Sequence, residues 1–300
     1  MKKAQTQAEV HGFLRGVRQA GKRVGFVPTM GSLHEGHRSL VRLARESTDF
    51  VVVSIFVNPK QFGPSEDFKR YPRDEERDIE ILEELGCDLL FLPTSEDIYS
   101  SCDRTKIEVE GLSEVLCGDS RPGHFEGVVL VVAKLFNIVC PDEAFLGQKD
   151  AQQAVIIQRM AADLDFPVRI VIGPTVREAD GLAMSSRNAC LSGDERKRAS
   201  TLYKALVDTR RKIEQGARDP EELKSMMRRT IEGAGFEIDY VEIADGATLE
   251  HSREIEGILL LAVAGRLGGT RLIDNIALKV SGSEVEEVLL QFPEWSRYGR

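Results

Sequence analysis

The stretch 27–39, Val-Pro-Thr-Met-Gly-Ser-Leu-His-Glu-Gly-His-Arg-Ser, restricts the fold of this sequence more than any other part. An apolar run rises from residue 22 to 27 and ends at Pro28, which predicts a strand. Ser32 is followed three residues later by Glu35, a capping-box pattern that predicts a helix beginning at Ser32. Gly31 lets the backbone pass close to a ligand, because a Cβ would obstruct that approach.

Two histidines lie at the start of this predicted helix. His34 falls in the first turn, where unpaired N–H groups and the helix dipole favour an anion. His37 falls in the middle of the apolar stripe, and Gly36 leaves space between the two rings. Paired imidazoles at such a place can hydrogen-bond a phosphate and stabilise the charge that develops as its P–O bond breaks. The stripe itself consists of Leu33, Leu40, Val41 and Ala44.

Two other interpretations of the histidines remain open from the residues alone. Each could be a satisfied core residue, which is the usual reading of one histidine on an apolar face. A zinc site would need a third ligand, and no Cys or His pair at ligand spacing follows, so no metal-ligating residue is predicted. Two histidines combined with two glycines and a cap favour phosphate chemistry.

Composition limits the class of protein. With 300 residues and 42% hydrophobic content, the chain can build about two domains with a core each. The longest apolar runs fall short of the ~20 residues of a membrane span, and the polar start has no signal-peptide core, so we expect no membrane association and a cytoplasmic location. The net charge of -9 disfavours nucleic-acid binding. Five cysteines without a C-x-x-C pair are expected to be reduced and mostly buried thiols: Cys87, Cys102, Cys117, Cys140 and Cys190.

Strand and helix patterns alternate up to about Thr175, which predicts a doubly wound parallel α/β sheet in a first domain, residues 1–175. Strands are expected at 22–27, 50–57, 88–92, 105–110, 143–146 and 168–172, and helices at 7–20, 74–85, 128–139 and 151–162. The remainder, residues 176–300, is predicted to be a smaller α+β domain. Its expected helices span 192–215 and 220–233, and its strands span 237–244, 257–264 and 267–276.

Several loops carry residues suited to ligand binding. The polar and aromatic loop 58–71 leaves the end of a buried strand, so it is a substrate loop or a plain surface connection. Arg121 and His124 beside glycines can reach a phosphate, whereas Lys134 is either a site residue or a snorkelling surface residue. The carboxylates of helix 74–85 could form a metal site, but a solvated face is the expected interpretation.

Two further loops complete the candidate phosphate site. In Gly147-Gln148-Lys149-Asp150 the lysine can carry phosphate charge, and the aspartate can accept from a ribose hydroxyl or cap the next helix. Met184-Ser185-Ser186-Arg187-Asn188 supplies hydroxyls and a guanidinium that can wrap a triphosphate as a mobile clamp. The alternative for this second loop is a simple domain junction.

These motifs resemble a known family. The His-x-Gly-His element is similar to the signature of the nucleotidyltransferase superfamily, and the wider sequence resembles the pantothenate synthetase family of pantoate and β-alanine ligases. The resemblance runs from residue 27 to 275 and is carried by four blocks in order: Pro-Thr-Met-Gly-Ser-Leu-His-Glu-Gly-His at 28–37, Phe-Val-Asn-Pro-Lys-Gln-Phe at 56–62, Gly-Gln-Lys-Asp-Ala-Gln-Gln at 147–153 and Met-Ser-Ser-Arg-Asn at 184–188.

The resemblance implies a Rossmann-like domain with a smaller C-terminal lid, working as a homodimer. It also implies that pantoate and β-alanine are joined with ATP and Mg²⁺. Pantoate's carboxylate would attack the α-phosphorus to give pantoyl adenylate and pyrophosphate, and β-alanine's amine would then displace AMP. Ser32 stands where Ala is common in the family, and Leu146 stands where an aromatic residue is expected, which bears on the shape of the pantoate pocket.

Site residues carried over from the resemblance fall into three groups. The catalytic residues would be His37, as proton donor, with His34 and Lys149. Gln61 would bind pantoate and β-alanine, and Gln153 would bind pantoate. The ATP site would be lined by Met30, Gly31, Ser32, Leu33, His34, Glu35, Gly36, His37, Gly147, Gln148, Lys149, Asp150, Val176, Met184, Ser185, Ser186 and Arg187.

Three other functions compete with this ligase. A transferase of the same superfamily would move AMP or CMP onto a phosphate and would release pyrophosphate without AMP. An aminoacyl-tRNA synthetase shares the mechanism, but the chain is short and acidic and has no obvious tRNA-binding appendage. A nucleotide sensor would bind ATP without turnover.

Overall fold

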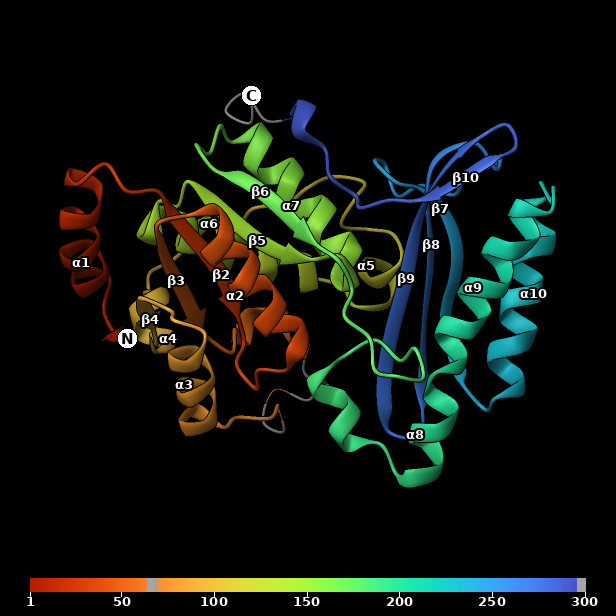
Figure 1. The fold of residues 1–300 in the computed structure, drawn as a ribbon, viewed down its shortest axis with the longest axis horizontal. Helices are drawn as coiled ribbons and strands as arrows, with labels where there is room; N and C mark the ends of the chain where they lie inside the picture. Colours follow the sequence, from red (N-terminus) through yellow and green to blue (C-terminus); the bar gives the residue numbers. More distant parts are fainter. Residues whose placement is uncertain (64–67, 69–70, 296–300) are drawn as a thin grey trace.

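The computed structural model describes residues 1–63, 68 and 71–295, and within these ranges the strands form two sheets. A six-stranded parallel sheet has the order β1-β4-β3-β2-β5-β6, and a four-stranded antiparallel sheet has the order β10-β9-β8-β7 (Figure 1). The first sheet consists of β1 (Lys2–Ala4), β2 (Val24–Thr29), β3 (Phe50–Ile55), β4 (Leu89–Phe91), β5 (Glu143–Gly147) and β6 (Arg169–Gly173). The second consists of β7 (Glu237–Asp245), β8 (Gly257–Leu267), β9 (Thr270–Ser281) and β10 (Glu284–Glu287).

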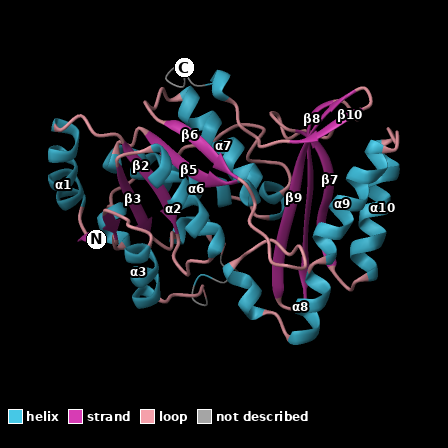
Figure 2. Cartoon of the chain, viewed as in Figure 1, coloured by secondary structure: helices cyan, strands magenta, loops and turns pink. Residues whose placement is uncertain are grey.

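Helices accompany both sheets (Figure 2). Those of the first part of the chain are α1 (Gln7–Gln19), α2 (Glu35–Ser47), α3 (Glu75–Glu84), α4 (Ser95–Ile98), α5 (Cys117–Ser120), α6 (His124–Val139) and α7 (Ala151–Asp163). Those of the second part are α8 (Gly193–Ala199), α9 (Thr201–Glu214) and α10 (Pro220–Gly233). Short 3₁₀ turns lie at Pro59–Gln61, Gln148–Asp150, Ser186–Cys190 and Pro293–Trp295. The apolar run 128–139 is helical, as its length predicted.

The parallel sheet is buried on both faces, which explains its nearly continuous apolar strands. On one face Val51, Val53 and Leu90 pack with α2 and α3. On the other face Val52 and Leu89 pack with α1, α6 and α7. Because neighbouring residues of a strand point to opposite faces, each strand serves both layers.

The second sheet also has two buried faces. Leu259 and Leu261 of β8 pack with α9 and α10, while Leu260 and Ala262 of the same strand belong to the core of the first sheet. The chain after β10 returns to the first sheet, where Leu290 and Phe292 are buried. Figure 1 shows this segment passing beside α7. The predicted α/β class, with a second, smaller C-terminal α+β unit, is confirmed.

The strand order brings two predicted motifs together at the carboxyl ends of the neighbouring strands β2 and β5. β2 lies between β3 and β5, so the chain after β2 and the chain after β5 turn away in opposite directions in the order β4-β3-β2-β5-β6. Open α/β sheets bind ligands outside the carboxyl ends of their strands at such a switch point. The His-x-Gly-His segment and Gly147–Asp150 both follow these carboxyl ends.

Some sequence predictions about elements were wrong. The helix after β2 begins at Glu35 and not at Ser32, because Ser32 has a left-handed φ of 51° that a helix cannot continue. Residues 105–110 form no strand in the described structure, since they are mostly exposed and pair with no neighbouring strand. The expected helix 192–215 is broken at Ser200 into α8 and α9. The short edge strands β1 and β10 were not predicted.

The expectation that the cysteines are mostly buried was also wrong. Cys87 and Cys117 are buried, whereas Cys102, Cys140 and Cys190 are exposed.

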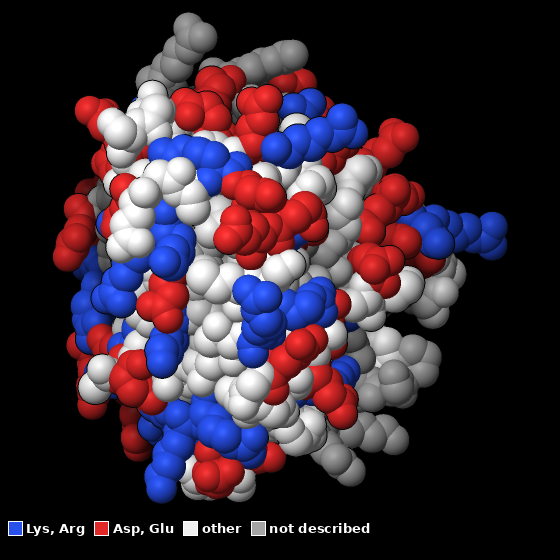
Figure 3. Space-filling model, turned by 90° about the vertical axis from the view of Figure 1, so that its right-hand side faces the viewer, with Lys and Arg blue, Asp and Glu red and all other residues white. Residues whose placement is uncertain are grey.

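The surface beside α9 and α10 carries charges of both signs. Figure 3 shows Lys and Arg interspersed with Asp and Glu on this side of the molecule, without one large basic field. Ion pairs within helices account for part of the pattern, among them Arg210–Glu214 of α9 and Arg228–Glu232 of α10. Among the described residues, no helix has the length and apolar character needed to cross a membrane.

The close contact of Gly127 in α6 with the loop after β3 can be tested by substitution. A Cβ added there would lie against the main-chain carbonyl of Lys60 and 2.7 Å from the nitrogen of Gln61. Gly127→Ala should therefore destabilise the protein by about 1–3 kcal/mol in urea denaturation. The matched control is Gly12→Ala in α1, where an added Cβ meets nothing within 4 Å and should stabilise by about 0.5–1 kcal/mol. Equal effects of both substitutions would contradict the close packing.

Candidate functional site

A cavity of about 220 Å³ opens at the switch point and gathers most of the predicted site residues. It is lined by Met30, His34, Gly36, His37, Gln61, Gly147, Lys149, Asp150, Gln153, Val176, Met184, Ser185, Ser186 and Arg187. Residues from four separated segments therefore meet in one place.

Five predicted residues are not among those that line this cavity: Gly31, Ser32, Leu33, Glu35 and Gln148. Leu33 is buried in the core beneath the motif, and Glu35 pairs with Arg42 at the surface. Gln148 is buried and accepts from the main-chain N–H of Leu290 at 3.1 Å. Their predicted contact with ATP stays a prediction. Lys134 pairs with Asp103 at 3.1 Å and lines neither this cavity nor the smaller one described below, so it is a surface residue.

Asp78 of α3 holds the loop that precedes the histidines. Its two carboxylate oxygens accept the main-chain N–H groups of Ser32 and Leu33, each at 2.7 Å. Burial raises the pKa of Asp78, and these two hydrogen bonds oppose that rise. The expectation that the carboxylates of this helix form a solvated face was wrong for Asp78, which is 2% exposed. Gly31 adopts a φ of 79° beside this carboxylate, where an added Cβ would lie 3.0 Å from Oδ2.

The two histidines cap the helix that carries them. His34 is the N-cap of α2, and its Nδ1 accepts from the N–H of Gly36 at 3.2 Å. The Nδ1 of His37 accepts from the N–H of His34 at 3.3 Å, which makes a capping box of two imidazoles. Because each Nδ1 is an acceptor, the neutral rings carry their proton on Nε2. The ring centroids are 4.1 Å apart, and both residues line the cavity.

Both imidazoles are held in the neutral form. Burial lowers the pKa of His34 to about 4, with a further lowering by Lys149 and an opposing effect of Asp150. Burial lowers the pKa of His37 to about 3, and the neighbouring His34 adds to this. At neutral pH the pair therefore offers two N–H donors to the cavity and no net positive charge.

Positive charge comes instead from other segments. The Nζ of Lys149 lies 3.7 Å from a carboxylate oxygen of Asp150, and its side chain is 19% exposed. Burial acts to raise the pKa of Asp150, but the positive charges of Lys149 and Arg187 lower it, so this carboxylate is ionised. The arrangement suits a polyanion: a lysine and an arginine supply charge, and two neutral imidazoles supply directional donors.

The opposite wall is built around Gln61. Its amide Nε2 lies 3.3 Å from the sulfur of Met30, and its Oε1 accepts from the amide of Asn58 at 3.1 Å. Asn58 in turn donates to the carbonyl of Gly127 and accepts from the hydroxyl of Tyr99 at 2.7 Å. This network fixes the glutamine amide at the cavity surface. An apolar wall adjoins it, formed by Val128, Val131, Val132, Leu135, Phe145, Leu146 and Ile157.

The loop after β6 is a small hairpin and not an extended junction. The N–H of Met184 donates to the carbonyl of Val176 at 2.9 Å, and Arg177 pairs with Ala183 in an isolated bridge. The hydroxyl of Ser185 then accepts from the N–H of Arg187 at 3.2 Å, which turns the chain into the cavity. Of the loop 58–71, residues 64–67, 69 and 70 lie outside the described residues, and Tyr71 lines the cavity.

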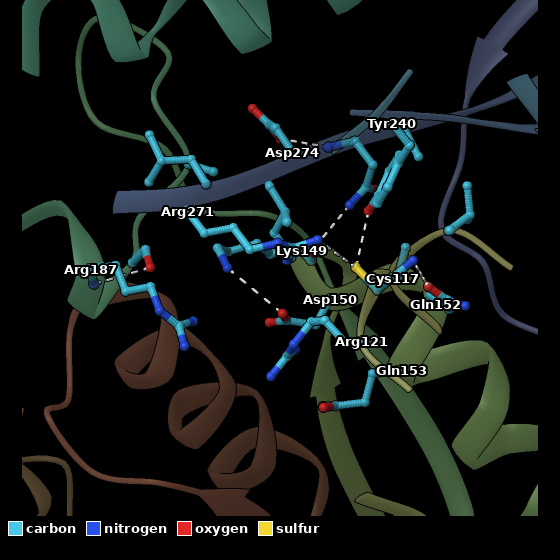
Figure 4. Close-up of a pocket in the computed structure, with 18 of the residues that line it drawn as sticks. Cys117, Arg121, Lys149, Asp150, Gln152, Gln153, Arg187, Tyr240, Arg271 and Asp274 are labelled. Carbon is cyan, nitrogen blue, oxygen red and sulfur yellow. Dashed lines mark hydrogen bonds and ion pairs between the residues drawn. The ribbon is translucent and has the colours of Figure 1, made fainter. Parts of the chain in front are cut away.

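A smaller cavity of about 80 Å³ adjoins the first (Figure 4). The residues that line both cavities are Arg121, His124, Lys149, Asp150, Gln153, Ser185 and Arg187. Its far side comes from the second sheet and from α5. The Cys117 thiol lies 3.2 Å from the Tyr240 hydroxyl and 3.5 Å from Arg271. Sequence reasoning missed this group, because Cys117 lies more than 100 residues before both of its partners and no local pattern connects them.

Proteins of known identity resemble this chain over nearly its whole length. A family model described as pantoate-beta-alanine ligase matches residues 2–277. A pantothenate synthetase of Moorella thermoacetica is 52% identical over 282 residues, covering 94% of this chain and 100% of the relative. One of Syntrophotalea carbinolica is 54% identical over 259 residues, covering 86% of this chain and 92% of the relative.

Solved structures agree with these relatives. A crystal structure of pantothenate synthetase from Thermus thermophilus is 46% identical with a TM-score of 0.86, covering 92% of this chain and 98% of that one. A pantoate-beta-alanine ligase from Francisella tularensis, complexed with beta-gamma ATP and beta-alanine, is 35% identical with a TM-score of 0.76, covering 92% and 97%.

The lowered pKa of His34 predicts a pH dependence of stability. Between the folded value of about 4 and the ordinary value of 6.5, the unfolded chain binds more protons, so stability falls as the pH falls through this window. His34→Asn keeps a good N-cap and removes the titrating ring. The variant should lose less stability than wild type between pH 7 and pH 5 in urea denaturation. Ser192→Asn, which changes the cap of α8, should keep the wild-type slope. If the unfolding free energies of His34→Asn and wild type fell equally between pH 7 and pH 5, the lowered pKa of His34 would be contradicted.

Asp78→Asn tests the clamp on the motif loop. The amide turns an N–H group toward one of the two main-chain donors, which leaves a buried donor unpaired and should destabilise the protein by about 1–3 kcal/mol. Glu80→Gln on the exposed side of the same helix should change stability by less than about 0.5 kcal/mol. Equal unfolding midpoints for the two variants would show that the clamp contributes nothing.

Proposed function

This chain belongs to the pantoate–β-alanine ligase family, and from that premise we propose that it condenses pantoate with β-alanine through a pantoyl-adenylate intermediate. The family makes it an AMP-forming ligase that forms a C–N bond. The observation that carries the two-step proposal is the pair of neutral histidines, which present Nε2–H donors beside Lys149 and Arg187 in one cavity.

In the first step a carboxylate oxygen of pantoate forms a bond to the α-phosphorus of ATP. The bond from that phosphorus to the bridging oxygen breaks, and pyrophosphate leaves with the electron pair. His34 and His37 donate hydrogen bonds to phosphate oxygens as charge develops, and Lys149, Ser185, Ser186 and Arg187 bind the departing phosphates. The carboxylate is already a nucleophile, so this step needs no strong general base.

In the second step the neutral amine of β-alanine attacks the acyl carbon of pantoyl adenylate. The C–N bond forms, AMP leaves with the electron pair of the acyl–oxygen bond, and the amine loses a proton to solvent. Gln61 and Gln153 orient pantoate, with Gln61 also near β-alanine, while the apolar wall that includes Leu146 packs against the hydrocarbon part of pantoate. The Francisella tularensis ligase, complexed with beta-gamma ATP and beta-alanine, supports this pair of ligands.

Mg²⁺ enters the proposal together with ATP. Such an ion usually keeps several waters and is held by substrate phosphates with one or two carboxylates. Among the described residues that line the larger cavity, Asp150 is the carboxylate, and its lowered pKa keeps it ionised, so the site fits a cation carried by the triphosphate. The ion would neutralise phosphate charge there. The described residues contain no group of three or more His, Cys, Asp or Glu side chains placed to hold a metal by themselves.

The predicted units 1–175 and 176–300 enter the proposal as nucleotide domain and lid. Their support is that the cavity takes residues from both, since Gly147–Asp150 precede the boundary and Met184–Arg187 follow it. A homodimer is proposed from the family resemblance. The boundary, the closure of the lid and the dimer stay predictions.

The experiment is ATP–pyrophosphate isotope exchange with pantoate present and β-alanine absent, followed by addition of β-alanine while AMP is measured. The ligase should show pantoate-dependent exchange and should release AMP only when the amine is added. His37→Ala should lower the exchange rate by about 10²–10³-fold because it removes a donor to the developing charge. His251→Ala, a surface change in the second part of the chain that lines neither cavity, should keep the wild-type rate.

Three outcomes would contradict parts of the proposal. No exchange with pantoate would withdraw pantoate as substrate, and pyrophosphate release without AMP would favour a transferase that moves the nucleotide onto a phosphate. ATP binding without any turnover would favour the nucleotide sensor. A His37→Ala rate equal to wild type would remove His37 from the mechanism.

A further inference from the structure

Asn275 connects the second sheet to the main chain beside Lys149. It lies on β9, is 5% exposed, and donates from Nδ2 to the carbonyls of Gln148 at 3.1 Å and Lys149 at 2.9 Å. The side chain of Gln148 completes the contact by donating to the Oδ1 of Asn275 at 3.5 Å. Both amide hydrogens of Asn275 are thus used on the backbone that aims the lysine.

Asp274, the preceding residue, connects the same strand to the hairpin after β6. Its carboxylate, 1% exposed, forms a bidentate pair with Arg177 at 2.7 and 3.0 Å. The same guanidinium donates to the carbonyls of Gly181 and Asn275 and lies 3.7 Å from the centre of the Tyr203 ring. Arg177 is therefore held on several sides, and it belongs to the hairpin that leads into Ser185–Arg187.

We propose that Asp274 and Asn275 are positioning residues that hold the two phosphate-binding segments of the cavity at a fixed separation. One segment is Gly147–Asp150, held through Asn275, and the other is the hairpin leading to Ser185–Arg187, held through Asp274 and Arg177. This role deepens the proposed function and rests on it. Both residues line the smaller cavity and act through their neighbours.

The alternative is that the two residues only stabilise the fold. A buried ion pair is weak evidence for stability, because the cost of desolvating two charges offsets much of their attraction. The contacts also end on residues that line or adjoin the cavity. If the two segments shift, ATP binding and the exchange rate should therefore change first, since displacements of about 1 Å can lower rates by about 100-fold. Pantoate binding should change less, because Gln61 is fixed separately by Asn58 and α6.

The test compares Asn275→Ala with Gln291→Ala. Gln291 is a matched control, since its amide also makes two main-chain bonds across the molecule, to Ile170 at 2.6 Å and Ile172 at 2.9 Å, but it lines neither cavity. Asn275→Ala should raise the Kd for ATP alone, measured by calorimetry, by about tenfold, and should raise the KM for ATP in the exchange assay by a similar factor. Its KM for pantoate should stay within about twofold. Gln291→Ala should lower stability while leaving both ATP constants unchanged.

Asp274→Asn and Arg177→Lys keep the inference testable if Asn275→Ala does not fold. Each keeps the approximate size of the side chain and weakens the bidentate pair, so each should raise the Kd for ATP several-fold in protein that is folded by circular dichroism. Wild-type ATP affinity and exchange rate in any of these folded variants would overturn the proposal. If the wild-type protein binds ATP but shows no pantoate-dependent exchange, the proposed function is overturned. The positioning role can still be tested in that case, because calorimetry compares the Kd for ATP alone between wild type and the variants.

Discussion

The site depends on one buried carboxylate that holds a loop of main chain. Asp78 accepts the N–H groups of Ser32 and Leu33, and this prevents the helix from beginning before residue 35. The delay leaves His34 in the N-cap position, where its ring and that of His37 accept the next free N–H groups of the helix. The two Nε2–H donors are therefore oriented by backbone hydrogen bonds that belong to the fold and that exist before any ligand arrives. Preorganised donors of this kind need little rearrangement as charge develops.

The second sheet contributes to the same site by a different route. Its strand β8 packs Leu260 and Ala262 against the core of the first sheet, so the two sheets share apolar packing and do not meet only through loops. Next to this shared packing, the neighbouring strand β9 contacts both phosphate-binding segments. Asn275 donates to the backbone of Lys149, and Asp274 pairs with Arg177 of the hairpin. Directional bonds made over a packed contact can fix positions, whereas the same bonds at a solvated junction would exchange with water.

Much of the fold followed from the sequence because its signals are local. Buried parallel strands appear as apolar runs, and the glycines and histidines of residues 31–37 occupy one strand-to-helix junction. The cavity also contains the residues expected at 147–150 and 184–187, apart from the side chain of Gln148. Asp78 could not be recognised among the acidic residues of α3, because its partners Ser32 and Leu33 lie 46 and 45 residues earlier. Cys117, Tyr240 and Asn275 were missed for the same reason, and the edge strands β1 and β10 are too short to give a periodic signal.

The outer edge of β6 is covered by the side chain of Gln291. The amide of Gln291 accepts the N–H of Ile172 and donates to the carbonyl of Ile170, so one side chain replaces part of a neighbouring strand. Because Gln291 lies 118 residues after β6 ends at Gly173, this edge stays open during synthesis until almost the whole described chain has left the ribosome. An open edge of apolar strands is a template for pairing with other chains. Nascent chains stalled within the second sheet would therefore aggregate more readily than the finished protein.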